Sequence, residues 1–162
     1  IGSLTESFSK KGRNFYWVPD NIYEILPLVW TPLGKRLNIG RYNVCGEKIG
    51  FQELVDHVAG SGTAWRKVFF PSQIMYLIDK QPNGESGFLA TDKWPNVFLM
   101  GGWPDRDRSK NPSLIPLFVS FMPKASPKSN FGWSIWTMPT GDLDPGMEDP
   151  SKFYPGRCHL IF

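Results

Sequence analysis

The stretch from Leu114 to Met138 constrains the fold more than any other part of this sequence. It contains two apolar runs, at 114–122 and 131–138, joined by a polar, proline-containing connection at 123–130. Aromatic and β-branched residues bounded by turn formers are typical of paired antiparallel strands. We therefore predict a hairpin at the centre of a sheet, whose long connection forms an exposed tip with two lysines.

Within the second run, the alternation predicts which side chains share a face of the sheet. Phe131, Trp133 and Ile135 fall on one face, whereas Trp136 and Met138 fall on the other. One of these faces must meet the core. The other presents aromatic groups that need either a cover from the same chain or a binding partner.

The composition agrees with a fold made of short elements. The aromatic fraction is 15%, and the chain holds 16 Gly and 15 Pro, which disfavours long helices and favours short strands joined by fixed turns. A length of 162 residues suits one domain with a sizeable core. We expect a flexible arm at 1–13, which is polar and basic, and a single globular domain at 14–162.

Helix signals are strongest in the first part of the chain. Asp20 is a suitable N-cap for one or two turns that end before Pro27. The segment 50–60 places apolar residues at the spacing of one helix face and ends at glycines. We predict an α+β protein, with a predominantly antiparallel β-sheet and a few short N-terminal helices. A mainly-β sandwich or barrel is the alternative.

Further strands are predicted at 41–45, 65–70, 97–100 and 157–162, and 15–18 is a short apolar run that Pro19 stops. The region 72–90 allows two interpretations. Asn83-Gly84 is a strong turn signal and favours a hairpin between Ile74–Ile78 and Phe88–Ala90. A short helix at 72–79 competes with this, because Pro71 suits the first helical turn.

The charge and hydropathy of the chain exclude few classes of protein. A net charge of +3 is mild, and permits contact with an acidic partner or nucleic acid without arguing for one. No apolar run approaches the roughly 20 residues of a membrane-spanning helix. Because the chain begins at Ile1 without Met, we expect a processed product or an excised domain. The overall pattern favours a secreted or surface-exposed location.

The two cysteines leave two interpretations open. Cys45 and Cys158 are too few for a disulfide framework or a zinc site. Each lies in a predicted strand, which favours two buried thiols. A single bridge from Cys45 to the C-terminal strand is the alternative, and it would imply an oxidising compartment.

Binding residues are predicted from the aromatic excess and the charged loops. The chain has 7 Trp, and exposed tryptophans stack on sugars, bases or partner side chains. Trp94 and Trp103, each of which precedes a proline, are the best candidates for exposure. The charged segment 105–108 is either a self-paired surface or a recognition tip. The predicted binding set is Trp94, Trp103, Asp105, Arg106, Arg108, Trp133 and Trp136.

The acidic segment 142–149 is the one candidate metal site. Asp142, Asp144 and Glu148 supply carboxylates of the type that calcium prefers. The EF-hand spacing is absent and Pro145 stiffens the loop, so a solvated acidic loop is the main interpretation. No cofactor is expected.

Acid–base chemistry has few candidate residues. In chain order the sequence offers His57, Glu85, Arg106 or Arg108, and His159. With helices first and a sheet afterwards, this order resembles that of small microbial guanyl-type ribonucleases. The resemblance covers the order of residues and elements and no shared motif. It implies an endoribonuclease in which His and Glu groups transfer protons and an Arg stabilises the phosphate charge.

These observations favour a non-enzymatic recognition or assembly domain. It would bind a protein surface or a glycan through exposed aromatics and charged loops, as a viral projection or a host-binding module does. The alternative is a small endoribonuclease or toxin domain that uses the His/Glu/Arg/His set. Oligomeric state and ligand identity do not follow from the sequence.

Overall fold

The computed structural model describes the parts of the chain that form the centre of the predicted domain. The described residues are 15–18, 22, 39–44, 49–50, 53, 69–92, 95–103, 106–107, 109–111, 113–128, 131–137, 152–153 and 156–161.

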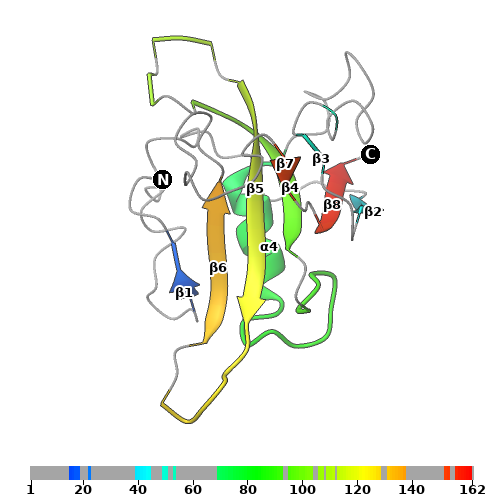
Figure 1. The fold of residues 1–162 in the computed structure, drawn as a ribbon, viewed down its shortest axis with the longest axis vertical. Coiled ribbons are helices and arrows are strands. Elements are labelled where there is room, and N and C mark those ends of the chain that lie inside the picture. Colours follow the sequence, from blue (N-terminus) through cyan, green and yellow to red (C-terminus); the bar gives the residue numbers. More distant parts are fainter. Residues whose placement is uncertain are drawn as a thin grey trace.

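One helix and a mostly antiparallel sheet make up this part of the fold (Figure 1). The sheet has six strands in the order β1-β6-β5-β4-β8-β2, and β3 pairs separately with β7. The helix α4 lies behind β4 and β5 in the view of Figure 1. The bounds are β1 Phe15–Trp17, β2 Ile39–Val44, β3 Ile49–Gly50, α4 Pro71–Asp79, β4 Asn96–Gly102, β5 Ser113–Met122, β6 Gly132–Thr137, β7 Lys152–Phe153 and β8 Gly156–Ile161.

The predicted central hairpin is confirmed. β5 and β6 pair antiparallel from Leu117↔Thr137 to Met122↔Gly132, and the connection between them forms the tip at the lower end of Figure 1. β4 pairs antiparallel with β5 on the other side, so β4, β5 and β6 form a meander at the centre of the sheet. β4 is buried along almost its whole length, which accounts for its unbroken apolar run.

The region 71–79 is a helix, so the hairpin interpretation of Ile74–Ile78 is wrong. Pro71 occupies the first turn, where its missing N–H has no cost. The Gln73 side chain accepts a hydrogen bond of 2.8 Å from the Phe70 amide and so fixes the entry to the helix. The predicted turn at Asn83-Gly84 does form, with Gly84 at φ +72°, but it follows a helix.

The core lies between α4 and the sheet. Trp133 is 1% exposed, and its ring meets Phe121 edge-on at 5.2 Å. Its indole N–H donates a hydrogen bond of 2.7 Å to the Gln81 carbonyl, just beyond the end of α4. Trp133 and Ile135 both belong to this core, as the period-two pattern predicts.

Two buried amide side chains hold the loop from residue 80 to residue 95. Gln81 accepts from the Leu89 amide at 2.8 Å and donates to the Leu89 carbonyl at 3.0 Å. Asn96 exchanges the same pair of bonds with Ala90, each at 2.8 Å, and also donates to the Val119 carbonyl. The loop is therefore fixed to the lower end of the sheet by side chains that imitate strand pairing.

As predicted, the sheet is predominantly antiparallel, although β1 pairs with β6 and β4 pairs with β8 in parallel. The predicted N-terminal helices lie outside the described residues except for Ile22 and Glu53, both of which are helical. The nine-residue α4 is too short to cross a bilayer. No other helix in the described segments meets the length and hydropathy that a membrane span requires.

Candidate binding surface

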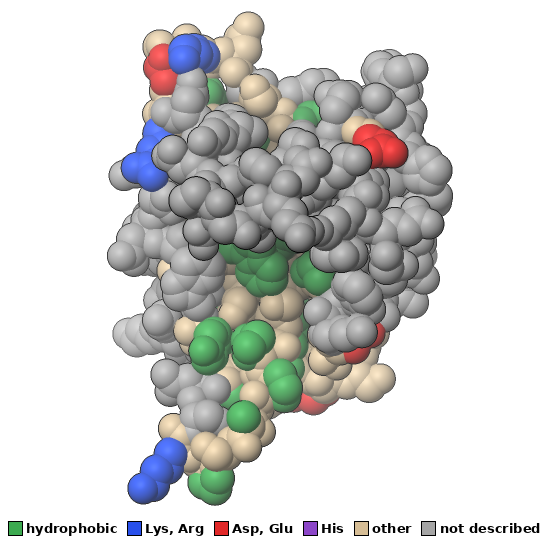
Figure 2. All heavy atoms as spheres, in the orientation of Figure 1, with side chains coloured by type: hydrophobic (Ala, Val, Ile, Leu, Met, Phe, Trp, Pro, Cys, Tyr) green, Lys and Arg blue, Asp and Glu red, His purple; other side chains and the backbone are tan. Residues whose placement is uncertain are grey.

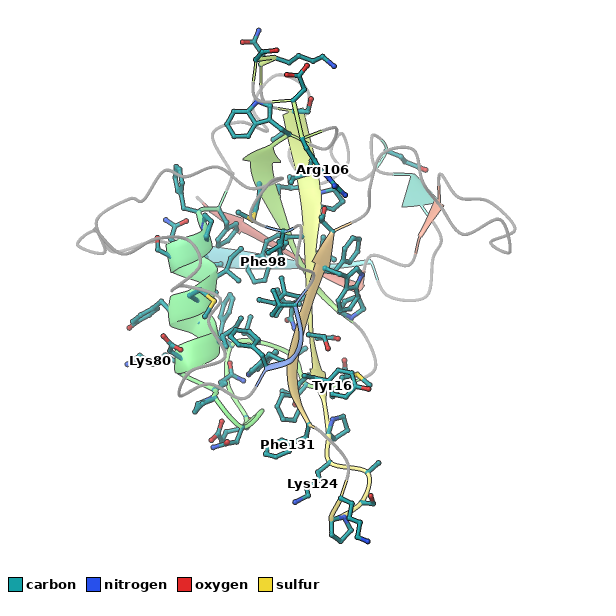
Figure 3. The ribbon with its side chains drawn as sticks, turned by 90° about the vertical axis from the view of Figure 1, so that its left-hand side faces the viewer. Tyr16, Lys80, Phe98, Arg106, Lys124 and Phe131 are labelled. Carbon is teal, nitrogen blue, oxygen red and sulfur yellow. The ribbon has the colours of Figure 1, made fainter. Side chains whose placement is uncertain are left out.

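The sheet face that points away from α4 carries a second set of apolar side chains. Because Val119, Phe121 and Trp133 point into the core, their neighbours in the strands point to the opposite side. We call this the open sheet face and define it by Tyr16, Ser120, Met122, Ser134 and Trp136. Figure 3 shows Tyr16 on this side, across the sheet from α4.

The open sheet face is covered at one end and exposed at the other. Along β5, Phe118 is 3% exposed, Ser120 is intermediate and Met122 is 41% exposed. On the neighbouring strand, Gly132 stands opposite Met122 and contributes no side chain. Tyr16, which lies on β1 level with Trp133 and Ser134 of β6, is 43% exposed. Two large exposed side chains thus lie about two strand spacings, ~10 Å, apart on one face.

Aromatic stacking fixes the covered end of this face. The rings of Phe118 and Trp136 lie nearly parallel, 10° apart, with centroids 5.6 Å apart. The Thr137 hydroxyl donates a hydrogen bond of 2.8 Å to the Pro116 carbonyl and ties the end of β6 to β5. Trp136 is half-buried and lies at the border of the exposed part, and its stacking on Phe118 holds its ring in place.

The tip between β5 and β6 carries two lysines, and Lys124 lies on the α4 side of the sheet because it packs on Phe131, a neighbour of the core. Lys124 follows Met122 by two residues, and its ammonium group lies 5.7 Å from the centroid of the Phe131 ring. Lys128 is exposed further along the tip. Figure 2 shows hydrophobic side chains over the middle and lower part of β5 and β6, with a basic side chain at the lower end. The sequence has no Asp or Glu between Asp107 and Asp142.

The loop between β4 and β5 is the second projecting feature, at the other end of the sheet. The Trp103 indole N–H donates a hydrogen bond of 2.8 Å to the Lys110 carbonyl. Arg106 is exposed at φ +60°, a conformation that side chains rarely adopt, and its amide bonds to the Trp103 carbonyl. Hydrogen bonds from the Ser109 hydroxyl and amide hold the pKa of Asp107 below its ordinary value. Hydrogen bonds within the loop therefore hold its described residues in place.

The residues of the predicted nuclease site do not come together in the described structure. Gly84, next to Glu85, packs against the Phe121 ring, whereas Arg106 follows the strand end that pairs with Ser113. Most of the length of β5, about 26 Å at the rise of a strand, separates these two regions. The backbone of His159 pairs with Phe98, midway between them. His57 lies outside the described residues.

Glu85 is held by hydrogen bonds within its own turn. Its carboxylate accepts hydrogen bonds of 2.9 Å from the amide and from the side chain of Asn83. Bonds from its own backbone amide and from Asn83 lower its pKa below the usual value.

The remaining predicted site residues divide into buried and undescribed ones. Trp133, predicted as a binding residue, belongs to the core and offers no exposed ring. Trp103 and Trp136 are half-buried. The described residues contain no cluster of metal-ligating side chains. Outside them lie Trp94, Asp105, Arg108, Asp142, Asp144, Glu148 and Cys45.

Sequence reasoning missed Tyr16 and Met122, the two most exposed members of the open sheet face. The alternation along β5 indicated the position of Met122. It lies on the same face as Ser120, and its neighbour Phe121 points to the other face, into the core. Tyr16 was not recognisable in this way. Its place depends on the pairing of β1 with β6, a contact between distant parts of the chain.

Comparison with protein-family models, with curated proteins and with solved structures finds no match to this chain. The function must therefore be argued from the chain's own residues.

Proposed function

We propose that this protein is a non-enzymatic recognition or assembly domain that binds a partner protein on the open sheet face. One observation carries the proposal: Tyr16 and Met122 are both exposed on the same side of the sheet, next to the half-buried Trp136. Tyr, Trp and Met are enriched in protein interfaces, where fixed aromatic side chains supply contact area at a low entropic cost.

The other exposed aromatic side chains support this choice by contrast. Tyr76 is exposed on α4, but the Lys80 ammonium group lies 5.2 Å from its ring centroid, and its immediate surroundings on the helix are charged. Single exposed apolar residues are normal on protein surfaces. Tyr16 differs because it shares one face of the sheet with Met122 and Trp136, and the paired Ser120 and Ser134 lie between them.

A protein partner fits this surface better than a glycan. Sugars stack on an open indole or phenol face with polar groups around the ring. Among the tryptophans whose side chains are described, Trp103 uses its N–H within its own loop, Trp133 is buried and Trp136 is half-buried. The exposed part is instead a mixture of Met, Tyr and Ser, which suits an apolar anchor on a protein.

The test is a selection of peptides against the whole protein from a random displayed library. Enriched peptides are made in soluble form, and their affinities are measured by calorimetry. We expect Tyr16→Ser/Met122→Ser to weaken binding about tenfold or more, because truncating central anchors removes most of the contact energy. Tyr76→Ser is the matched control and leaves the affinity unchanged.

Three results would contradict the proposal. Peptides that bind the double variant and the parent equally well would place the contact elsewhere on the molecule. RNA cleavage that disappears in His159→Ala would favour the endoribonuclease alternative, which needs a proton-transferring group at that position. Strong binding to a glycan array, together with no enriched peptide, would indicate that the partner is a sugar and not a protein.

A further inference from the structure

We propose that Asn83 is a site of spontaneous deamidation in this protein, and that the Glu85 carboxylate restrains the reaction in the folded chain. The proposal is independent of the binding function. It follows from an Asn-Gly pair in an exposed turn, together with the hydrogen bonds that hold the amide groups of Asn83 in that turn.

The sequence concentrates this reactivity at one position. Asparagine is among the thermolabile residues of proteins, and its deamidation begins when the backbone nitrogen of the following residue attacks the side-chain carbonyl carbon. A bulky or branched following residue hinders that attack, proline has no N–H to give up, and glycine, which has no Cβ, obstructs it least. Asn83 is the one asparagine in the chain that precedes glycine, and the others precede Phe, Ile, Val or Pro.

The reaction needs only water. The backbone nitrogen of Gly84 forms a bond to Cγ of Asn83, and the side-chain nitrogen of Asn83 leaves as ammonia with the proton that the Gly84 nitrogen gives up. The product is a cyclic imide that joins the two residues. Water then opens the imide at either carbonyl, which leaves aspartate, or isoaspartate in which the backbone runs through the former side chain. The net change replaces an amide by a carboxyl group.

The turn exposes Asn83 to water but holds the groups that must react. The side-chain nitrogen of Asn83 donates a hydrogen bond of 2.9 Å to one oxygen of Glu85, and its backbone nitrogen donates one of 2.9 Å to the other oxygen. The attacking nitrogen is held as well, because the Gly84 amide donates a hydrogen bond of 3.0 Å to the Gln81 carbonyl. Ring closure requires rotations that bring Cγ of Asn83 onto the Gly84 nitrogen, and these bonds restrict them.

Conversion would change more than the turn itself. A new carboxylate at position 83 would replace a hydrogen bond to Glu85 by a contact between like charges. Isoaspartate would also lengthen the backbone directly before Gly84, which packs so closely on the Phe121 ring that there is no room for a Cβ. Phe121 in turn contacts Trp133 in the core between α4 and the sheet. Because such interiors are close-packed, the longer backbone should disturb that core.

The experiment incubates the full chain at mildly alkaline pH, both in buffer and in urea, where the turn is lost. Peptide mass spectrometry locates and counts the converted residues, and samples are followed until the chain in urea has converted completely. Glu85→Ala removes both acceptors, whereas Glu85→Gln keeps one acceptor oxygen. Asp107→Ala is the matched control, because it removes an exposed, hydrogen-bonded carboxylate from the loop between β4 and β5. Circular dichroism checks that each variant is folded in buffer.

In the parent, we expect conversion at Asn83 ahead of every other asparagine, and more slowly in buffer than in urea. Glu85→Ala should speed the reaction in buffer about three- to tenfold, because the two hydrogen bonds no longer restrain Asn83. In urea it should have no such effect. Glu85→Gln should lie between the parent and Glu85→Ala, and Asp107→Ala should match the parent.

Several results would overturn the proposal. Asn83 would still be intact in the folded parent when the chain in urea has converted, or another asparagine would convert first. Equal rates in buffer and in urea would mean that the turn has no restraining effect. The role of Glu85 would be wrong if Glu85→Ala sped the reaction no more than Asp107→Ala. It would also be wrong if the increase were the same in urea, because the effect would then come from proximity in sequence.

Discussion

Trp133 and Trp136 lie three residues apart on β6 and face opposite sides of the sheet. Trp133 packs under α4, with its ring against Phe121 and its N–H bonded to the Gln81 carbonyl. Trp136 stacks on Phe118 and stays half-buried. On the covered face, Trp133 therefore has partners both in the sheet and in the loop that follows α4. On the open sheet face, apolar contacts end before Met122, where side chains are exposed.

This difference separates residues that determine stability from residues that are available for binding. Removing a side chain from a packed interior loses its contacts and leaves a cavity, whereas an exposed side chain has little to lose. Mutations on the covered face should therefore change the free energy of unfolding, whereas mutations on the open sheet face should change the affinity for a partner.

The largest expected effect comes from Trp133→Ala. Loss of a fully buried aromatic side chain costs about 3–5 kcal/mol of the free energy of unfolding, and here the Gln81 carbonyl also loses its donor. Urea denaturation measures the change. Tyr16→Ala on the open sheet face is the control, with an expected change within about 0.5 kcal/mol. Equal effects for the two variants would mean that the faces do not differ as described.

The next effect tests the loop that closes the covered face. Gln81→Ala removes a buried amide that bonds both to the Leu89 backbone and to the Glu85 carbonyl, and should cost about 1–3 kcal/mol because buried backbone groups lose their partners. Asn83→Ala, an exposed amide in the same turn, should cost clearly less. The same denaturation assay compares them, and a smaller loss for Gln81→Ala than for Asn83→Ala would contradict the assignment.

A smaller effect of opposite sign is expected within α4. Ser72 is 4% exposed, and its hydroxyl has no hydrogen-bond partner among the described residues. Ser72→Ala removes an unsatisfied polar group and raises helix propensity, so the free energy of unfolding should increase by up to about 1 kcal/mol. Thermal unfolding measures this as a higher Tm. A lower Tm would show that the hydroxyl bonds to a water molecule inside the covered layer.

The smallest effect concerns the titration of Glu85, on the α4 side of the tip. Because hydrogen bonds lower its pKa, Glu85 stabilises the folded state above the pKa of the unfolded chain, and this contribution is lost as the pH falls through the folded pKa. NMR titration of the carboxyl carbon should give a pKa below the usual value. Asn83→Ala should raise it only in part, since the first cause is the amide of Glu85 itself. An unchanged pKa in that variant would contradict the side-chain bond.

Local patterns predicted much of the centre of this fold. The run 114–122 and the run 131–138 correspond closely to β5 and β6, and alternation correctly placed Trp133 and Ile135 on one face. The helix at 71–79 was only one of two interpretations, because Asn83-Gly84 forms a turn that follows a helix as readily as it joins two strands. Local sequence determines such a turn without determining what precedes it.

The candidate surface was harder to predict because it depends on non-local pairing. Aromatic content indicated binding, but it selected Trp133, whose burial depends on α4 and on the carbonyl of Gln81. It did not select Tyr16, whose exposure next to Met122 depends on the parallel pairing of β1 with β6. No periodicity within one strand identifies its neighbour.

The parallel pairing of β1 with β6 also has a consequence for the order in which the molecule is built. It joins Phe15 to Trp133, almost at opposite ends of the chain, whereas β4, β5 and β6 are consecutive. Closing a long loop costs more entropy than closing a short one, and non-local contacts slow folding. We expect the meander to form first and β1 to join late. Tyr16 would then take its place level with Trp133 and Ser134 in one of the last steps, and the surface would become competent for binding only once folding is nearly complete.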